Sequence, residues 1–465
     1  MFLSEYKFII FPIASLVCVP TGIAFACLSR KIHDFIFMFL VFGTCMPSGL
    51  FGQPTDINFL SREWYRGTTR GIEISYLDLL AIVLFISSLI VRRREGRPYY
   101  WPPSLTPLLL FAGWCLLNVV VMSDPKIFGL FELTKILRGI MLFLAVTAYI
   151  RSPREIRVFV WVLALTILYQ AGICLRDRYL YHMHRIRGTL GHPNSLSMYC
   201  LQCIAIFVAA VFAKDSSKMI RIVCALAFLG ASGCVLLTIS RTGFLSLMLL
   251  CAASFGLFMG LRITPGKVAI ALVACILVSG MVYKSWDSIM SRLGELDLEK
   301  EYFSEEGDRG SYFRQGAPAI ADNPITGVGL NNWSWWITNR YGLPVRPDYV
   351  PYVSTTIPPQ SLTASAAPAH NLYLLTVTEL GWPGLFLFII LLIRWSWMSG
   401  KSLFGGRDML VQSVRLGAFL SLGGVILQSW TEWEFRQTPM FFLGHIVMGV
   451  AASLYYYCDL KAKKA

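Results

Sequence analysis

The chain has 465 residues, of which 55% are hydrophobic and only 15% are charged, and its mean hydropathy is +0.59. This composition excludes a soluble globular protein of that length and predicts an all-α polytopic membrane protein. The formal net charge of +14 is spread over alternate connections between apolar runs, a distribution that argues against nucleic-acid binding.

Apolar runs long enough to cross a bilayer follow one another along the chain. We expect about twelve to thirteen spans, at 8–28, 34–51, 73–91, 105–122, 129–150, 156–175, 194–213, 220–239, 242–260, 266–283, 371–393, 412–430 and 439–457. The first run is too long and too proline-broken for a signal peptide, so no cleaved segment is expected. Four parts result: N-terminal spans (1–175), central spans (176–283), a large loop (284–369) and C-terminal spans (370–465).

Basic residues gather in alternate connections, such as 92–97, 151–157, 214–221 and the C-terminal 461–464. The positive-inside rule makes these connections and the C-terminus cytoplasmic, and an odd number of spans then places the N-terminus outside. The large loop is therefore expected on the outer face of the membrane.

Three ionisable residues of the fifth apolar run, Glu132, Lys135 and Arg138, recur every three residues and so share one helical face. The expected topology places them in the outer half of the membrane, where ionisable groups are costly and usually face a cavity or a partner. We expect Lys135 and Arg138 to contact substrate.

Arginines also persist in the outer connections, where the sorting rule disfavours them. Those that we single out are Arg187, Arg241, Arg309 and Arg314. Positive charge kept there indicates an anionic ligand, with contacts to lipid headgroups or carbonyls as the alternative. In "GHPNSL", Asn194 stands where a helix is expected to begin, and the free N–H groups of a helix start favour an anion.

The large loop of about 86 residues is long enough to have structure of its own. Its first half predicts an amphipathic helix, a turn at Gly307 and a second helix that ends before "DNPITGVG". The tryptophans at 333, 335 and 336 are typical of a membrane-interface patch. A Pro/Ser/Thr-rich lid is expected after them, with a disordered linker over 354–368 as the alternative.

His370 and Asn371 stand where the large loop enters an apolar run that Gly381 and Pro383 break. A lone interfacial histidine is often structural, but arginines from three connections converge on the same face. We therefore expect His370 to be catalytic and Asn371 to contact substrate. No metal-ligand grouping, GxxxxGK[ST] loop or GxSxG elbow occurs in the sequence, so neither a metal nor a cofactor is expected.

Four stretches carry a resemblance to a known family: "RIRGTLGHPNSLSMY", "LLTISRTGFLSL", "RGSYFRQGAPAIADNPITGVGLNNW" and "AHNLYLLTVTELGWPGLF". In order and spacing, over about 187–393, the chain resembles the O-antigen ligase/polymerase superfamily of bacterial inner-membrane enzymes, which have about a dozen spans and one large periplasmic loop. The upstream "DINFLSREWYRGTTRGIEISYLDLLAI" is similar to the exopolysaccharide- or exosortase-associated subset.

The resemblance implies metal-independent transfer of a preassembled glycan from a polyprenyl diphosphate carrier to an acceptor hydroxyl on the periplasmic face. Arg187 and Arg241 match the diphosphate-binding arginines of the superfamily, His370 matches its essential histidine, and Arg309 matches an arginine of less settled role. The stretch from Gly329 to His370 is longer than in many ligases, which leaves the acceptor open: glycan, lipid or protein.

These residue types suit that chemistry. Arginine stays charged and binds phosphate oxygens bidentately, so it neutralises a diphosphate leaving group that needs no general acid. A histidine titrates near ambient pH and can activate the acceptor hydroxyl, and attack opposite the diphosphate inverts the anomeric centre. Glu432 or Glu434 is expected to orient His370 or to contact the acceptor.

Polymerase and ligase remain open, and the upstream segment favours a polymerase; a ligase would transfer the glycan to lipid A core or to protein. A flippase or polysaccharide transporter is a further alternative, although we find no convincing internal repeat and the polar residues gather on one face. A membrane acyltransferase is also considered, but its histidine signature is not found. The expected partners are the lipid-linked donor, the acceptor and membrane lipids.

Overall fold

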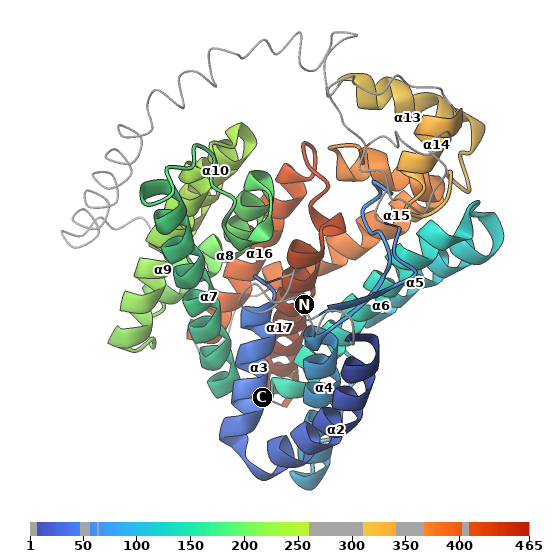
Figure 1. Cartoon of the computed structure of the whole chain (residues 1–465). Coiled ribbons are helices and arrows are strands. Elements are labelled where there is room, and N and C mark those ends of the chain that lie inside the picture. The colour runs from blue at the N-terminus through green and yellow to red at the C-terminus, as the bar shows by residue number, and fades with distance from the viewer. Residues whose placement is uncertain are drawn as a thin grey trace.

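The computed structural model describes residues 7–46, 56–62, 65–259, 310–340, 367–401 and 409–464. Figure 1 shows long helices packed as a bundle, with two shorter helices of the large loop above one end of it. In chain order the helices are α2 (Lys7–Leu28), α3 (Arg30–Gly43), α4 (Tyr76–Arg94), α5 (Leu105–Leu117), a π-helical turn (Asn118–Met122), α6 (Lys126–Tyr149), α7 (Pro153–Tyr179), a 3₁₀ turn (Gly188–Leu190), α8 (Pro193–Phe212), α9 (Lys218–Leu237), α10 (Arg241–Met259), α13 (Gly310–Asp322), α14 (Trp333–Arg340), α15 (Leu372–Gly400), α16 (Met409–Gln428), a 3₁₀ turn (Glu434–Arg436) and α17 (Thr438–Lys464).

Within the described ranges, nine helical segments are long and apolar enough to cross a membrane: Phe11–Leu28, Leu105–Met122, Pro153–Tyr179, Pro193–Phe212, Lys218–Leu237, Arg241–Phe258, Leu372–Gly400, Leu410–Gln428 and Thr438–Tyr457. Three other expected spans correspond to helices outside this set. α3 has only 14 residues, and α4 and α6 each carry four charged residues. The expected span at 266–283 lies outside the described residues. The protein is an all-α polytopic membrane protein, as its composition predicted.

A small β-hairpin was not expected from the sequence. β1 (Asp56–Phe59) pairs antiparallel with β2 (Ile72–Ser75), with Ile57 opposite Ile74. Strands of four residues give too few alternations of apolar and polar residues to stand out from a connection. The hairpin brings the chain that joins its strands against α6 and the large loop.

α13 confirms the second helix expected in the large loop, and it ends where "DNPITGVG" begins. The first expected helix, the turn at Gly307 and most of the expected lid lie outside the described residues. Of the tryptophans expected in a membrane-interface patch, Trp333 is buried, whereas Trp335 and Trp336 are partly buried. Trp333 is buried against Leu374 and Leu375, and the ring of Trp335 lies 5.6 Å from that of Phe128. These side chains instead attach the loop to the bundle.

The expected break in α15 is confirmed, because Gly381 has φ +67° inside the helix. Pro383 has no N–H to give Glu379, and the N–H of Trp382 turns to the carbonyl of Pro324 at 2.9 Å. Two carbonyls, those of Thr378 and Glu379, are thereby left without their helical donors. They accept instead from the N–H of Val328 (2.8 Å) and the N–H of Gly329 (3.0 Å), and the carbonyl of Leu380 accepts from the indole Nε1 of Trp114 (3.0 Å). The large loop therefore completes the hydrogen bonds of α15.

Candidate functional site

His370 lies just before α15, and its Nδ1 is 3.0 Å from Oε2 of Glu432, in the connection between α16 and α17. The other oxygen of Glu432 accepts a hydrogen bond of 2.6 Å from Nδ2 of Asn194, in the first turn of α8. One carboxylate therefore joins the starts of two helices that are far apart in the sequence. The side chain of Glu432 is 3% exposed and that of His370 is 32% exposed, so the imidazole is the accessible end of this arrangement.

Helix capping explains why these residues meet. Asn371 is the N-cap of α15: its Oδ1 accepts from the N–H of Leu374 (2.9 Å), and its Nδ2 donates to the carbonyl of Trp430 (3.0 Å). The N–H of Leu372 donates to the carbonyl of Ser429 (2.9 Å). These bonds fix the start of α15 to the end of α16. The amide of Asn371, expected to contact substrate, is thus engaged at both ends by the protein.

The connection between α7 and α8 supplies a second histidine and an arginine. Nδ1 of His192, the N-cap of α8, accepts from the N–H of Asn194 at 3.2 Å. Arg185 donates to Oδ1 of Asn194 (3.4 Å) and to the carbonyl of Thr238 (3.3 Å), just before the turn at Ser240 and Arg241. Burial lowers the pKa of His192, as do Arg185 and His370, while Glu432 opposes them. We call His192, Asn194, His370 and Glu432 the histidine site.

The expected arginines take different places. Arg187 directly precedes the 3₁₀ turn at Gly188–Leu190 and its side chain is exposed, whereas it is Arg185 that contacts Asn194. Arg241 begins α10 and is partly buried. Arg314 is exposed on α13, and Arg309 lies outside the described residues. From α13, Tyr312 stacks on His370 with 5.8 Å between the ring centroids, so this loop helix covers one face of the imidazole.

Of the two carboxylates expected near His370, it is Glu432 that makes the contact. Glu434 points into the bundle, where it is fully buried and accepts a 3.1 Å hydrogen bond from Nε2 of Gln202. Burial raises the pKa of Glu434 well above its usual range, which Gln202 opposes and the nearby charge of Glu432 reinforces. The sequence alone could not show which of the two residues contacts His370, because they are two positions apart in a short connection.

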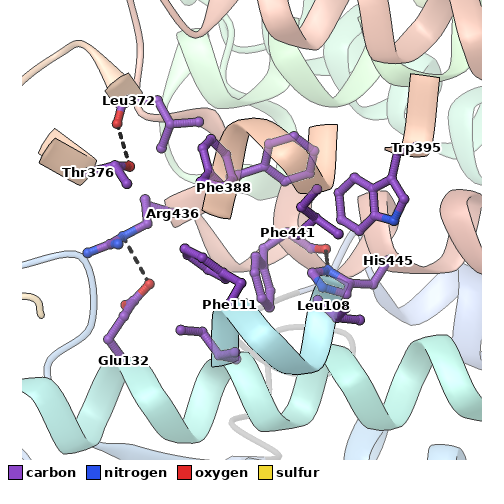
Figure 2. A pocket seen from close by; sticks show the side chains of 13 residues that line it. Leu108, Phe111, Glu132, Leu372, Thr376, Phe388, Trp395, Arg436, Phe441 and His445 are labelled. Carbon is purple, nitrogen blue, oxygen red and sulfur yellow. Dashed lines mark hydrogen bonds and ion pairs between the residues drawn. The ribbon is translucent and has the colours of Figure 1, made fainter. Parts of the chain in front are cut away.

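Lys135 and Arg138 have protein partners rather than an open cavity. Lys135 is 2.8 Å from Glu132 and donates to the carbonyl of Arg436 at 2.6 Å, while Arg436 reaches Glu132 at 3.1 Å and also pairs with Glu379. We call Glu132, Lys135, Glu379 and Arg436 the buried network. Figure 2 shows Arg436 facing Glu132. Both side chains line a small pocket of about 30 Å³ whose other lining residues are largely aromatic and aliphatic. Arg138 pairs with Asp78 at 2.8 Å.

The large loop reaches this network through Asn331. Its N–H donates to Glu379 (2.9 Å), and its Nδ2 donates to the carbonyls of Thr69 (3.0 Å) and Phe128 (2.9 Å). The hydroxyl of Thr68 lies 2.8 Å from Glu132. The connection between β1 and β2 and the large loop are therefore joined to α6, α15 and the α16–α17 connection at one place.

An apolar groove of about 890 Å³ runs along α15 and α16. Leu385, Ile389, Ile393 and Phe419 line it, Lys401 lies at one end, and Tyr373 and Trp430 lie at the end beside the histidine site. Tyr373 is two residues from Asn371 and Trp430 is two residues from Glu432. The groove offers an apolar surface that leads to the polar site.

Among the described residues, no three His, Cys, Asp or Glu side chains are grouped so that they could hold a metal ion. What the fold and site define is a polytopic all-α membrane protein with a half-exposed histidine, its carboxylate and several arginines at one end of the bundle. A family model described as O-antigen ligase matches residues 225–389, which supports the resemblance to the O-antigen ligase/polymerase superfamily and a glycosyltransferase-like membrane enzyme. No curated protein matches the chain. The matched residues include Arg241 and His370, whereas His192, Asn194 and Glu432 lie outside them.

Proposed function

We propose that the protein is a metal-independent, inverting glycosyltransferase that moves a preassembled glycan from a polyprenyl diphosphate to an acceptor hydroxyl on the periplasmic face of the bacterial inner membrane. The observation that carries this proposal is the contact between Nδ1 of His370 and Glu432 at 3.0 Å. A carboxylate only accepts, so Nδ1 carries the hydrogen and the lone pair of Nε2 is left to take a proton.

In this mechanism Nε2 of His370 removes the proton of the acceptor hydroxyl as its oxygen attacks the anomeric carbon. The bond from that carbon to the diphosphate oxygen breaks, and the electron pair leaves with the diphosphate. Glu432, 3% exposed, stabilises the imidazolium that forms. The proton then passes from His370 to the diphosphate or to water, which restores the base.

Arginines neutralise the leaving group in this proposal. Arg241 and Arg187 are the diphosphate-binding candidates carried over from the resemblance. Arg309, which matches an arginine of less settled role, lies outside the described residues, and Arg314 is exposed on the helix that covers His370. Each arginine offers a planar, permanently charged fork of donors. The apolar groove beside α15 and α16 suits the prenyl chain of the carrier, because Tyr373 and Trp430, which line one part of it, are close in sequence to Asn371 and Glu432.

Within this class we favour a polymerase that joins repeat units of an O-antigen or exopolysaccharide, because of the upstream segment around 56–82. The second candidate is a ligase that uses lipid A core or a protein as acceptor. The two differ only in the acceptor, so a transfer assay with exchanged acceptors separates them.

The test uses purified full-length protein in detergent, a polyprenyl-diphosphate oligosaccharide as donor, candidate acceptors and EDTA. Glycan size and released carrier are followed for the wild type, Arg241→Ala and His370→Ala, with His184→Ala, an exposed histidine of the α7–α8 connection, as the matched control. A glycan ladder from donor alone that both site variants abolish supports a polymerase, and a single shift that requires lipid or protein supports a ligase. Full activity in both site variants would exclude this site. With the protein reconstituted in vesicles instead, movement of the lipid across the bilayer without cleavage would favour the transporter.

A further inference from the structure

The proposed mechanism uses one histidine, but two imidazoles lie at the site. His192 stands directly before α8 and His370 directly before α15, and Asn194 and Glu432 connect them through hydrogen bonds of 3.2, 2.6 and 3.0 Å. Each charge within this set acts on His192, whose pKa responds to Glu432, Arg185 and His370. His192 is therefore part of the same electrostatic environment as the proposed base.

The hydrogen bonds give the two rings opposite tautomers. A backbone N–H always donates, so Nδ1 of His192, which accepts from Asn194, has a lone pair and the hydrogen of the neutral ring is on Nε2. Nδ1 of His370 faces a carboxylate, so its hydrogen is on Nδ1 and its Nε2 is bare. At Nε2, His192 is therefore a hydrogen-bond donor and His370 is a hydrogen-bond acceptor.

The surroundings of Nε2 of His192 identify the ligand class. The side chain of His192 is only partly buried, and no hydrogen bond from its Nε2 is found among the described residues. Arg185 is bonded to the same Asn194 and its charge acts on His192, and Arg187 is exposed in the same connection. A hydrogen-bond donor beside a cation suits an anionic oxygen better than a hydroxyl that must lose a proton.

We propose that His192 is a second functional histidine of this site, which donates a hydrogen bond from Nε2–H to an oxygen of the donor's diphosphate while His370 accepts the proton of the acceptor. This inference rests on the proposed function, since it names the part of the donor that the second imidazole binds. It divides the site into a diphosphate side at the start of α8 and an acceptor side at the start of α15.

The first test measures binding without turnover, with a glycan-free polyprenyl diphosphate as the probe and the full-length protein in nanodiscs. His192→Asn keeps an N-cap oxygen for the N–H of Asn194 but removes the Nε2–H donor. We expect the Kd to rise about tenfold, as for one lost hydrogen bond to a charged group, while His184→Asn, from the same connection, stays within about twofold. An unchanged Kd for His192→Asn, or an equal rise for His184→Asn, overturns the contact.

A second measurement reads the tautomers directly and does not depend on any variant being active. The chain has only six histidines, so ¹⁵N-histidine NMR spectra in nanodiscs can be assigned with single His→Asn variants. We expect His192 with its hydrogen on Nε2 and His370 with its hydrogen on Nδ1. A neutral His192 with its hydrogen on Nδ1 would contradict the proposal.

The results also separate this inference from the proposed function. Wild-type protein that binds the carrier through His192 but transfers no glycan would remove the proposed function and keep the diphosphate contact. Wild-type protein that transfers glycan, with an unchanged Kd in His192→Asn, would keep the function and remove the contact. In the transfer assay, His192→Asn is expected to raise the KM for the donor and leave the KM for the acceptor unchanged.

Discussion

The buried network and the histidine site are built from similar residues but differ in how their charges are satisfied. In the buried network two acidic and two basic side chains face one another, and every one of them is at most 7% exposed. In the histidine site Glu432 is equally buried, but the imidazole that it contacts is 32% exposed. Charged side chains that neutralise one another inside the protein hold segments of the chain together. An ionisable side chain that stays accessible can instead bind a substrate.

One short connection belongs to both regions. Glu432 and Arg436 lie four residues apart between α16 and α17, and Arg436 is held by Glu132 and Glu379. The buried network thus fixes the segment that presents Glu432 to His370. Arg436 is a positioning residue in this description, and its loss should act on catalysis only through the fold.

Breaking the buried network is expected to have the largest effect. Arg436→Met leaves Glu132 and Glu379 with only one buried cation, and breaking such a buried pair costs about 3–5 kcal/mol. We expect a marked loss of thermal stability in detergent. The double variant Arg436→Met with Glu379→Gln restores the charge balance and should recover part of that loss. A single variant as stable as the wild type would show that the network does not hold the connection.

Removing the charge that supports His370 is expected to act on rate rather than on folding. Glu432→Gln keeps the side-chain shape but no longer stabilises the imidazolium, so kcat should fall about 10²-fold or more. Thermal stability should change little, which distinguishes this variant from Arg436→Met. Glu434→Gln is the matched control, because burial already favours the neutral form of Glu434, and its kcat should stay within about twofold of the wild type. Equal loss in both variants would contradict the assignment of Glu432.

The raised pKa of Glu434 predicts a pH dependence of stability. A carboxyl whose pKa is higher in the folded protein contributes stability that is fully present below its unfolded pKa near 4.5 and is lost as pH rises toward the folded value. The slope in that window is at most about 1.4 kcal/mol per pH unit. Unfolding measured from pH 4.5 upward should show this decline in the wild type, and Glu434→Gln should flatten it. Identical slopes would exclude Glu434 as the source.

Replacing Arg138 is expected to have the smallest effect. Its pair with Asp78 is partly exposed, 13% and 15% for the two side chains, so Arg138→Gln should cost only about 1 kcal/mol. The KM for donor should not change, because the guanidinium already has Asp78 as a partner. A donor KM raised severalfold in a stable Arg138→Gln protein would restore the expectation that Arg138 contacts substrate.

The all-helical class and the break in α15 could be predicted because they follow from local signals: long apolar runs, Gly381 and Pro383. The meeting of Asn194, His370 and Glu432 could not, because nothing in the spacing of three distant segments records which of them pack together. The assignment of Arg187 to the diphosphate comes from the resemblance, and the assignment of Lys135 to substrate follows from the cost of a charged group in a membrane. In the structure Glu132 forms an ion pair with Lys135. The second cation that pairs with Glu132 is Arg436, which lies 304 residues further along the chain.

The break at Gly381 also bears on how the protein is assembled. Carbonyls of Thr378 and Glu379 cannot remain bare in hydrocarbon, and their donors at Val328 and Gly329 are synthesised before α15 begins. A nascent α15 therefore reaches its final form only when a segment already translated returns to dock on it. Truncated chains that end after α15 but lack residues 324–332 should for this reason insert that helix poorly, however apolar it is.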